Sequence, residues 1–342
     1  MDNIAIRDAF GEALKKLGGV NDKVVALDAD VGGSTKSAVF GKEYSDRYFN
    51  VGISEMNMVS MAAGLATDGY IPFANTFAVF LTTRGADPIQ ALISYDKLNV
   101  KLAGTYCGLS DSYDGASHQA ITDIALMRAI PNMTVISVSD AVETEKAVFA
   151  AAEYEGPVYL RLSRAASPVI YDENMKFKIG KGITVREGKD VTIIVTGTVL
   201  NKAIEEAELL KIEGISANVI DMHTIKPIDK ELIISCVKNT GAIVTVEEHS
   251  VYGGLGSAVA EVLAEECPAP IEIIGATEFA ESGDYEQLLE KYGYSAKSIS
   301  EKCKKAIARK WLVWKNQWEN IWRLELSSIW HLMGWLLVKV QS

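Results

Sequence analysis

Two successive sets of alternating strand and helix patterns constrain the fold of this 342-residue sequence most strongly. Short apolar runs typical of buried strands alternate with stretches of helical period, and glycines such as Gly18, Gly19 and Gly69 close the helices. Alternation of this kind is typical of parallel sheets with helices packed on both faces. The sequence therefore predicts an α/β fold with two doubly wound parallel-sheet domains.

The first set occupies residues 3–165 and the second occupies residues 190–308. Between them, residues 166–189 lose the alternation and gain turn residues and charge, which indicates a connector. In the first set we expect strands at 23–28, 47–51, 70–74, 98–105, 133–137 and 158–162, and helices at 5–17, 55–68, 77–94, 120–130 and 141–152. In the second set we expect strands at 191–196, 216–221, 242–247 and 271–274, and helices at 200–211, 229–239 and 255–266.

The charge of the chain is acidic and dispersed. Its formal net charge is −11, and no basic run is available to neutralise the phosphates of a polymer, which argues against a nucleic-acid partner. The four cysteines lie far apart without the spacing of a zinc site or a disulfide framework, which suits a reducing cytoplasm. We find neither a start typical of a signal peptide nor an apolar run of membrane-spanning length, so we expect a cytoplasmic protein without a membrane partner.

Residues 309–342 depart from the rest of the chain in composition. All six tryptophans fall after residue 310, and most follow one another at intervals typical of one helix face. Two interpretations stay open for this tail: an interfacial or partner-binding helix, and an extension foreign to the native protein, such as a reading-frame error. We assign it no chemistry.

The segment Arg47-Tyr-Phe-Asn-Val-Gly-Ile-Ser-Glu-Met-Asn57 places one carboxyl group, that of Glu55, where a strand ends and an apolar helix begins. A carboxyl group desolvated there can stay protonated near neutrality and donate a hydrogen bond to the ring nitrogen of a heterocyclic cofactor. The alternative is an ordinary helix start, because acidic residues favour the first helical turn and Ser54 is a suitable N-cap. This segment alone favours the ordinary helix start. The rest of the chain shifts the preference toward a carboxyl group that binds a cofactor.

Two aromatic residues follow the strand expected at 70–74. Phe77 and Phe80 lie three positions apart in the helix expected at 77–94, so they share one face of it. Such a face can stack on a flat pyrimidine ring, although most aromatic pairs of this spacing belong to a core.

A loop rich in hydrogen-bonding groups, residues 106–119, follows the strand expected at 98–105 and precedes a helix. Ligands of open parallel sheets bind at this end of the strands. Asp114 and His118 can bind sugar hydroxyls or transfer a proton, since His is the side chain that titrates near neutrality. A surface turn with a helix cap is the alternative.

Three further residues are candidates for binding an anion. Arg7, Ser34 and Arg164 offer guanidinium and hydroxyl groups that suit a sugar phosphate, although each alone is compatible with an ordinary surface residue. The glycine-rich pieces at 32–36 and 253–256 match neither a P-loop nor a dinucleotide-binding fingerprint. We therefore predict no nucleotide site.

Three of these segments, in this order, carry a resemblance to a known family. Residues 49–56, Phe-Asn-Val-Gly-Ile-Ser-Glu-Met, resemble the catalytic-glutamate segment of transketolases, and residues 76–80 resemble their pyrimidine-stacking segment. Residues 114–119, Asp-Gly-Ala-Ser-His-Gln, resemble their Asp-Gly-Pro-Thr-His-Gln loop. The chain from 3 to 308 thus resembles the C-terminal half of a transketolase, which consists of a pyrimidine-binding domain and a C-terminal domain.

The resemblance implies a chemistry and a set of site residues. Transketolases transfer a two-carbon ketol unit from a ketose phosphate to an aldose phosphate through a thiamine diphosphate adduct, a step of the pentose phosphate pathway. The resemblance implies that Glu55 and His118 are catalytic, with Glu55 activating the pyrimidine ring. The implied cofactor-binding residues are Asp30, Glu55, Phe77 and Phe80. The implied substrate-binding residues are Arg7, Ser34, Tyr106, Asp114, His118 and Arg164.

The resemblance also implies a partner. Transketolases hold the diphosphate of the cofactor through Mg²⁺ in a separate domain with a Gly-Asp-Gly motif, and this sequence has no such motif. In the family the two cofactor-binding domains meet across a subunit interface. We therefore expect a second polypeptide that carries the diphosphate-binding domain and the Mg²⁺ ligands, an α2β2 heterotetramer, and no metal ligand on this chain.

Some positions depart from the family pattern. Tyr106 stands where the family usually has a substrate-contacting histidine, and Thr83 lies near the position of its usual pyrimidine-pocket tyrosine. In the loop, Tyr113 replaces an acidic residue and Ala116 replaces a proline. A phenol carries no positive charge toward a phosphate, so the substrate can be a modified sugar. Further alternatives are the beta subunit of a 2-oxoacid dehydrogenase, an enzyme resembling deoxyxylulose-phosphate synthase, and a non-catalytic subunit that kept the fold.

Overall fold

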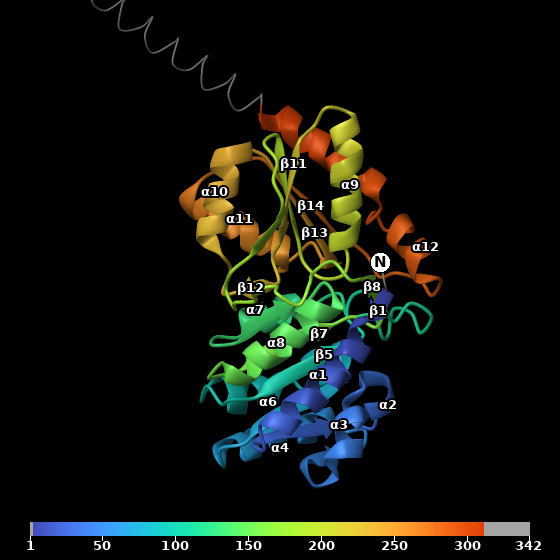
Figure 1. Ribbon diagram of the computed structural model, residues 1–342, viewed down its shortest axis with the longest axis vertical. Helices are drawn as coiled ribbons and strands as arrows, with labels where there is room; N and C mark the ends of the chain where they lie inside the picture. The colour runs from blue at the N-terminus through green and yellow to red at the C-terminus, as the bar shows by residue number, and fades with distance from the viewer. Residues whose placement is uncertain (1–2, 311–342) are drawn as a thin grey trace, which may run out of the picture.

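The computed structural model describes residues 3–310, so the tryptophans of the tail, and with them both interpretations of it, lie outside the described residues. Two α/β units follow each other along the long axis of the molecule, the first in blue to green and the second in yellow to red (Figure 1). None of the helices within the described range combines the length and the apolar character needed to cross a membrane.

The first unit is built on a seven-stranded sheet. Its strands are β2 (Val24–Asp28), β3 (Tyr48–Asn50), β4 (Ile71–Phe77), β5 (Lys101–Thr105), β6 (Thr134–Ser137), β7 (Val158–Leu162) and β12 (Thr224–Lys226). They lie in the order β12-β6-β7-β5-β4-β2-β3, and every pair is parallel except β12 with β6. Strands buried on both faces read as continuous apolar runs, which is why β2 and β7 are visible in the sequence.

Helices cover both faces of this sheet. One face packs against α1 (Ile6–Val20), α3 (Ser37–Glu43) and α8 (Ala141–Glu153). The other face packs against α4 (Glu55–Thr67), α5 (Ala78–Arg84), η2 (Ile89–Ser94) and α7 (Asp123–Ala129). The expectation of a doubly wound parallel sheet is confirmed for this unit.

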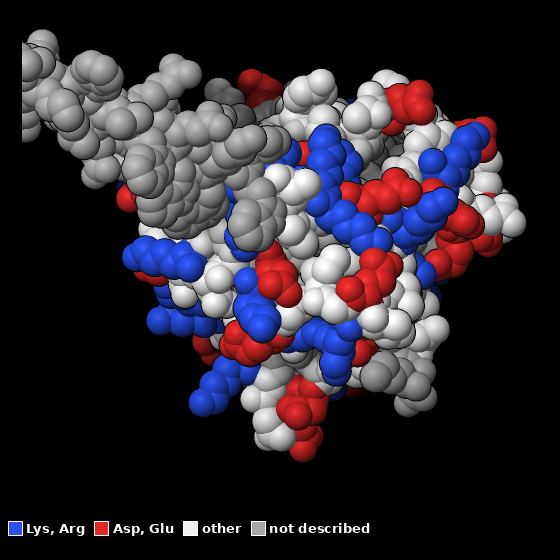
Figure 2. All heavy atoms as spheres, turned by 90° about the horizontal axis from the view of Figure 1, so that it is seen from above, with Lys and Arg blue, Asp and Glu red and all other residues white. Residues whose placement is uncertain are grey.

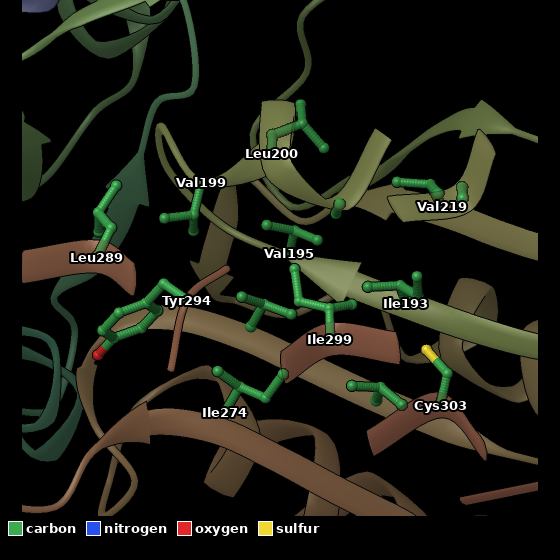
Figure 3. Packing of buried hydrophobic residues seen from close by; sticks show 14 of the residues in the cluster. Ile193, Val195, Val199, Leu200, Val219, Ile274, Leu289, Tyr294, Ile299 and Cys303 are labelled. Atoms are coloured by element: carbon green, nitrogen blue, oxygen red, sulfur yellow. The ribbon is translucent and has the colours of Figure 1, made fainter. Parts of the chain in front are cut away.

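The second unit is also a sheet covered by helices on both faces, but its sheet has five strands. Its sheet contains β9 (Ile183–Arg186), β10 (Val191–Val195), β11 (Ala217–Asp221), β13 (Ile243–Ser250) and β14 (Ile271–Ala276), in the order β14-β13-β10-β11-β9, with only β9 antiparallel. One face packs against α9 (Leu200–Ile212), α12 (Tyr285–Lys291) and the helical residues 296–310, and the other packs against α10 (Lys230–Thr240) and α11 (Leu255–Glu266). Figure 3 shows Ile193 and Val195 of β10 against Ile299 and Cys303 in the first of these layers.

The surface at the end of the second unit carries charges of both signs. Seen from that end, lysine and arginine side chains are interspersed with aspartate and glutamate over the described surface (Figure 2). A mixed face of this kind keeps a protein soluble without forming a single-sign field for a polyanion.

Two features differ from the sequence expectation. The prediction of a single helix at 77–94 is wrong. Phe77 ends β4, and the residues after it form α5, α6 (Ala86–Pro88) and the π-helical turn η2. Gly85 and Pro88 fall at these breaks, and a proline inside a helix removes a backbone donor.

The second difference concerns the boundary between the units. Strand β12 follows β11 of the second unit in the chain, yet it pairs antiparallel with β6 of the first unit. The short pair β1 (Asn3–Ala5) and β8 (Ala166–Pro168) also joins the start of the chain to the connector. Local periodicity cannot reveal such pairings, because they are decided by long-range contacts.

Candidate active site at the carboxyl edge of the first sheet

The residues predicted for the site gather at one edge of the first sheet. Strands β7, β5, β4, β2 and β3 are neighbours, and the five are parallel, so their carboxyl ends meet along that edge. The predicted residues are Asp30 and Ser34 after β2, Glu55 after β3, Phe77 and Phe80 at the end of β4, Tyr106, Asp114 and His118 after β5, and Arg164 after β7. Ligands of open α/β sheets bind at this edge.

Glu55 begins α4 and its carboxyl group is buried, with 5% of the residue exposed. Its Oε1 accepts a hydrogen bond from Arg84 Nη1 at 2.8 Å. The same guanidinium lies over the Phe80 ring, with Cζ 4.1 Å from the ring centroid. A charge-assisted hydrogen bond from Arg84 therefore fixes the orientation of this carboxyl group. Ser54 occupies the N-cap position, but its side chain makes no cap hydrogen bond in the described structure.

Aromatic rings form a continuous row from Phe80 to Tyr106. The ring of Phe77 lies 5.9 Å from that of Phe80 and 4.2 Å from that of Tyr106, in stacked orientations. His118 presents its edge to Phe80 at 5.2 Å between ring centroids. Phe77 and Phe80 thus lie together as expected, although one ends a strand and the other belongs to the following helix.

Two guanidinium groups flank the other end of this row. Arg7 comes from the first turn of α1 and Arg164 follows β7, and the Cζ atoms of both lie 5.3 Å from the Tyr106 ring centroid. Arg7 Nη1 donates to the Tyr106 hydroxyl and, at 3.4 Å, to the backbone oxygen of Ser34. Tyr106 adopts a left-handed backbone conformation, with φ of 60°. A non-glycine residue there is uncommon and is often found at functional sites.

The loop after β5 brings a further carboxyl group to the edge. Asp111 is buried, and its Oδ1 accepts a hydrogen bond from Arg164 Nη1 at 3.0 Å. Burial raises the pKa of Asp111 to about 6, with the neighbouring Asp114 adding to the rise and Arg164 and His118 opposing it. Asp114 is exposed, and Ser117 Oγ lies 2.9 Å from His118 Nδ1.

The loop after β2 is shaped by a buried aspartate. Asp28 accepts hydrogen bonds from the backbone N–H of Val31 at 2.6 Å and from the hydroxyls of Thr35 and Ser37 at 2.9 and 2.8 Å. Burial raises the pKa of Asp28 above its ordinary value, and these hydrogen bonds oppose the rise. Asp30 is exposed and accepts a hydrogen bond from Asn50 Nδ2 at 2.9 Å, so Asp30 faces the edge without joining the row of rings.

Sequence reasoning missed three residues of this edge. Arg84 lies one helical turn after Phe80, and that spacing is a usable signal for a side-chain pair. Asp28 directly ends an apolar strand, where ligand-facing polar residues are common. No local signal distinguishes Asp111 from the other polar residues of its loop.

A buried carboxyl group, a stacking ring and a pair of arginines at the carboxyl edge of a doubly wound sheet form a site of the class that can hold an aromatic ligand and an anion. The family models specify the class further. Residues 2–169 match the model "Transketolase, pyrimidine binding domain", and residues 180–299 match "Transketolase, C-terminal domain". The chain belongs to the transketolase family.

Individual relatives agree with this assignment. A Methanocaldococcus jannaschii protein assigned as a transketolase C-terminal section is 46% identical over 87% of this chain and 94% of its own length. The 6-deoxy-6-sulfo-D-fructose transketolase subunit SqwH of a Clostridium species is 39% identical over 89% of this chain and 95% of its own length. The chain spans half the length of human transketolase, to which it is 40% identical over 90% of this chain.

One solved structure matches this chain along almost its whole length. It is described as a split gene transketolase in an inactive β4 tetramer, and it is 50% identical with a TM-score of 0.85. The match covers 90% of this chain and 99% of that one.

Proposed function

We propose that this chain is the pyrimidine-domain subunit of a two-chain transketolase, which transfers a two-carbon ketol unit from a ketose phosphate to an aldose phosphate. The observation that carries the proposal is the arrangement of Glu55, Phe80 and the Arg7–Arg164 pair along one sheet edge. The family models for both domains and the full-length match to a transketolase C-terminal section support it. The contacts of one guanidinium, that of Arg84, with both the Glu55 carboxyl group and the Phe80 ring disfavour a non-catalytic role.

The residues present fit the pyrimidine ring of thiamine diphosphate. The guanidinium of Arg84 is flat and cationic, and it already contacts the Glu55 carboxylate and the Phe80 ring together. A protonated aminopyrimidine is also flat and can make the same two contacts. Glu55 and Phe80 would hold that ring, with Phe77 and Asp30 nearby. When bound, thiamine diphosphate supplies the carbanion chemistry that makes and breaks the carbon–carbon bond.

The chain's own residues divide the remaining tasks. Glu55 would hold a proton between an Oε atom and the ring nitrogen of the pyrimidine. His118 and Asp114 would bind the sugar hydroxyls, with the imidazole of His118 able to transfer a proton. Arg7 and Arg164 would bind the phosphate, because guanidinium groups form charge-assisted hydrogen bonds with phosphate oxygens. The carbonyl oxygen of Ser34, at 3.4 Å, accepts a hydrogen bond from Arg7 and would orient it.

A partner chain would complete the site. Apolar side chains are exposed beside Glu55, with Ile53 at 77% and Met56 at 53% exposed, and such a patch suits a protein interface. Within residues 3–310 no group of three or more potential metal ligands is found. We propose that the partner carries the diphosphate-binding domain and the Mg²⁺ ligands, and that the pair forms an α2β2 heterotetramer. The inactive β4 tetramer of the solved relative supports the need for a second chain.

We further propose that residues 3–165 and 190–308 are the two functional domains and that the protein works in the cytoplasm. The limits of the two family models lie close to this division. The cysteines Cys107, Cys236, Cys267 and Cys303 are all unpaired, which suits a reducing compartment.

A second candidate substrate is a sulfonated sugar. The relative of nearly equal length that is named as a subunit of a 6-deoxy-6-sulfo-D-fructose transketolase favours it. The guanidinium groups of Arg7 and Arg164 both lie beside the ring of Tyr106, and the family usually has a histidine at this position, so the anion subsite would differ from the usual one. A sulfonate and a phosphate are both tetrahedral oxyanions, and guanidinium groups bind either.

The decisive experiment is reconstitution with a partner chain that carries the diphosphate-binding domain, thiamine diphosphate and Mg²⁺. Transfer from xylulose 5-phosphate to ribose 5-phosphate is measured with each chain alone and with both together. The proposal expects transfer only with both chains. A parallel assay with 6-deoxy-6-sulfofructose as donor decides between the two sugars. An assembled complex that is inactive with both donors would contradict the proposal.

A further inference from the structure

The loop that carries Asp114 and His118 is attached to the second unit at several points. The backbone N–H of Leu109 donates to Glu248 Oε1 at 3.2 Å. The backbone N–H of Gly283 donates to the carbonyl oxygen of Ser112 at 3.0 Å, and Gln119 Nε2 donates to the carbonyl oxygen of Glu281 at 3.3 Å. The loop is therefore held by hydrogen bonds to two segments of the second unit, the end of β13 and the residues before α12.

Two glycines let this loop approach the second unit closely. Gly108 and Gly115 have φ of 59° and 76°, a conformation that other residues adopt only with strain. A Cβ atom on Gly108 would lie 2.8 Å from Glu248 Cβ, and one on Gly115 would lie 2.3 Å from Ser282 Oγ. The contact is thus a close fit between loop and second unit.

Glu248 is the centre of this contact. It is almost fully buried at the end of β13, and its Oε2 accepts hydrogen bonds from the Tyr285 hydroxyl at 2.8 Å and from Thr198 Oγ1 at 3.1 Å. Its backbone oxygen accepts a hydrogen bond from Arg161 of the first unit at 2.8 Å. A buried carboxylate is tolerated when donors saturate it, and these donors also fix its orientation.

We propose that Glu248 and Tyr285 are positioning residues for the sugar-binding loop, so that the second unit sets how tightly the donor sugar is held. This inference rests on the proposed function of Asp114 and His118. Tyr285 fixes Glu248, Glu248 fixes Leu109, and the loop from residue 108 to 119 carries the two sugar-binding side chains. The contacts from Tyr285 through Glu248 to Leu109 do not include the cofactor-side residues Glu55 and Phe80, and the loop touches Phe80 only at its far end, through the ring edge of His118.

The first test is the variant Tyr285→Phe, which removes one hydroxyl and keeps the ring. Tyr294→Phe is the matched control, because Tyr294 is a buried tyrosine of the same unit whose hydroxyl has no hydrogen-bond partner within the described residues (Figure 3). In the reconstituted complex, Tyr285→Phe is expected to raise the KM for the donor sugar about five- to tenfold, as for the loss of one ordinary hydrogen bond. The affinity for thiamine diphosphate should change less than about twofold in both variants.

Amide hydrogen exchange gives a readout independent of transfer activity. In the isolated chain, the backbone amides of the 108–119 loop should exchange faster in Tyr285→Phe than in the native chain, and Tyr294→Phe should leave them unchanged. If the amides of this loop exchanged at the native rate in Tyr285→Phe, the inference would be overturned, whether or not the complex transfers ketol units. A donor KM equal to that of the native complex would overturn it as well.

Replacement of Glu248 separates hydrogen bonding from fold stability. Glu248→Gln keeps an oxygen that can accept from Leu109 and an NH2 group that can donate to the hydroxyl of Tyr285, so the donor KM should stay within about threefold of native. Glu248→Leu loses both contacts and should raise the donor KM at least as much as Tyr285→Phe. If both Glu248 variants melted earlier while the donor KM stayed native, the contact would be structural only and the inference would be wrong.

Discussion

Arg84 holds the carboxylate of Glu55, with 2.8 Å between Nη1 and Oε1, while its guanidinium covers the Phe80 ring. These are the two contacts that we propose for the pyrimidine of the cofactor. The Arg84 side chain is half exposed, so it can leave without unpacking a core. The guanidinium and the pyrimidine would therefore compete for one place.

This competition predicts the effect of Arg84→Met on cofactor binding. Removal of the guanidinium should tighten binding of thiamine diphosphate to the assembled complex by about two- to fivefold, because a partly exposed ion pair contributes no more than about 1 kcal/mol. Titration of the cofactor, followed by calorimetry, measures this. Arg186→Met is the control, since Arg186 pairs with Glu208 in the second unit. Weaker binding in Arg84→Met would mean that Arg84 helps to hold the cofactor.

Replacement of Glu55 tests the proposed proton transfer. Glu55→Ala should assemble with the partner chain and lose transfer activity by about 10²- to 10⁴-fold, the usual contribution of general acid–base catalysis. Steady-state transfer rates together with size-exclusion chromatography measure both properties. Glu12→Ala, which alters an exposed residue of α1, serves as control and should keep native activity. Full activity of Glu55→Ala would refute the role given to this carboxyl group.

The anion subsite is tested through Arg164. Arg164→Gln removes a charge-assisted contact, so the KM for xylulose 5-phosphate should rise about tenfold or more. The KM for unphosphorylated xylulose should change much less, since that sugar offers no phosphate. The ratio of the two KM values is the measurement, and equal increases for both sugars would show that Arg164 acts on the loop as a whole. The pKa of Asp111 should also rise above about 6 in this variant, because Arg164 opposes the effect of burial.

A buried pair of carboxyl groups, those of Glu143 and Asp221, lies where the two units meet. Ser139 Oγ lies 2.8 Å from Glu143 Oε2 and 3.0 Å from Asp221 Oδ2, and the Tyr171 hydroxyl donates to Asp221 at 2.7 Å. One hydroxyl proton can serve only one of the two carboxylates, so the arrangement favours a proton on the pair. Burial raises the pKa of Asp221 to about 7 and that of Glu143 well above its ordinary value, and Asp140 adds to both shifts.

This pair predicts how stability depends on pH. Both pKa values are higher in the folded chain than in the unfolded chain, so unfolding releases protons, and stability falls as pH rises from about 4 toward 8. Glu143→Gln keeps an acceptor for Ser139 and removes one titrating group. The variant should melt about 1–2 °C higher than the native chain at pH 8 and show a flatter dependence of Tm on pH, since roughly 1 kcal/mol shifts Tm by about that amount for a chain of this size. Thermal unfolding between pH 5 and pH 8 measures this, and parallel curves for the two proteins would contradict it.

Much of this protein is determined by local sequence. The apolar runs of β2 and β7 and the helical period of α8 and α9 are local properties, so most strands of both sheets and most of their helices were predictable with ends accurate to a few residues. The short elements α3, β9 and β12 were not expected from the sequence. The segments around Glu55, Phe80 and His118 carry the family resemblance within short stretches. The carboxyl ends of parallel strands meet at one edge by geometry, so the gathering of these residues was also predictable.

Tertiary structure decided the contacts that join distant segments. The antiparallel pairing of β12 with β6, the Glu248 contact to Leu109 and the ion pair between Glu55 and Arg84 all join residues far apart in the chain. No local pattern encodes such partners, because a side chain's partner depends on which surfaces the whole fold brings together. The family resemblance and the chemistry that it implies could therefore be inferred from the sequence. The roles of Glu248, which contacts the sugar-binding loop, and of Arg84, which occupies the Glu55 carboxyl group, became visible only in the tertiary structure.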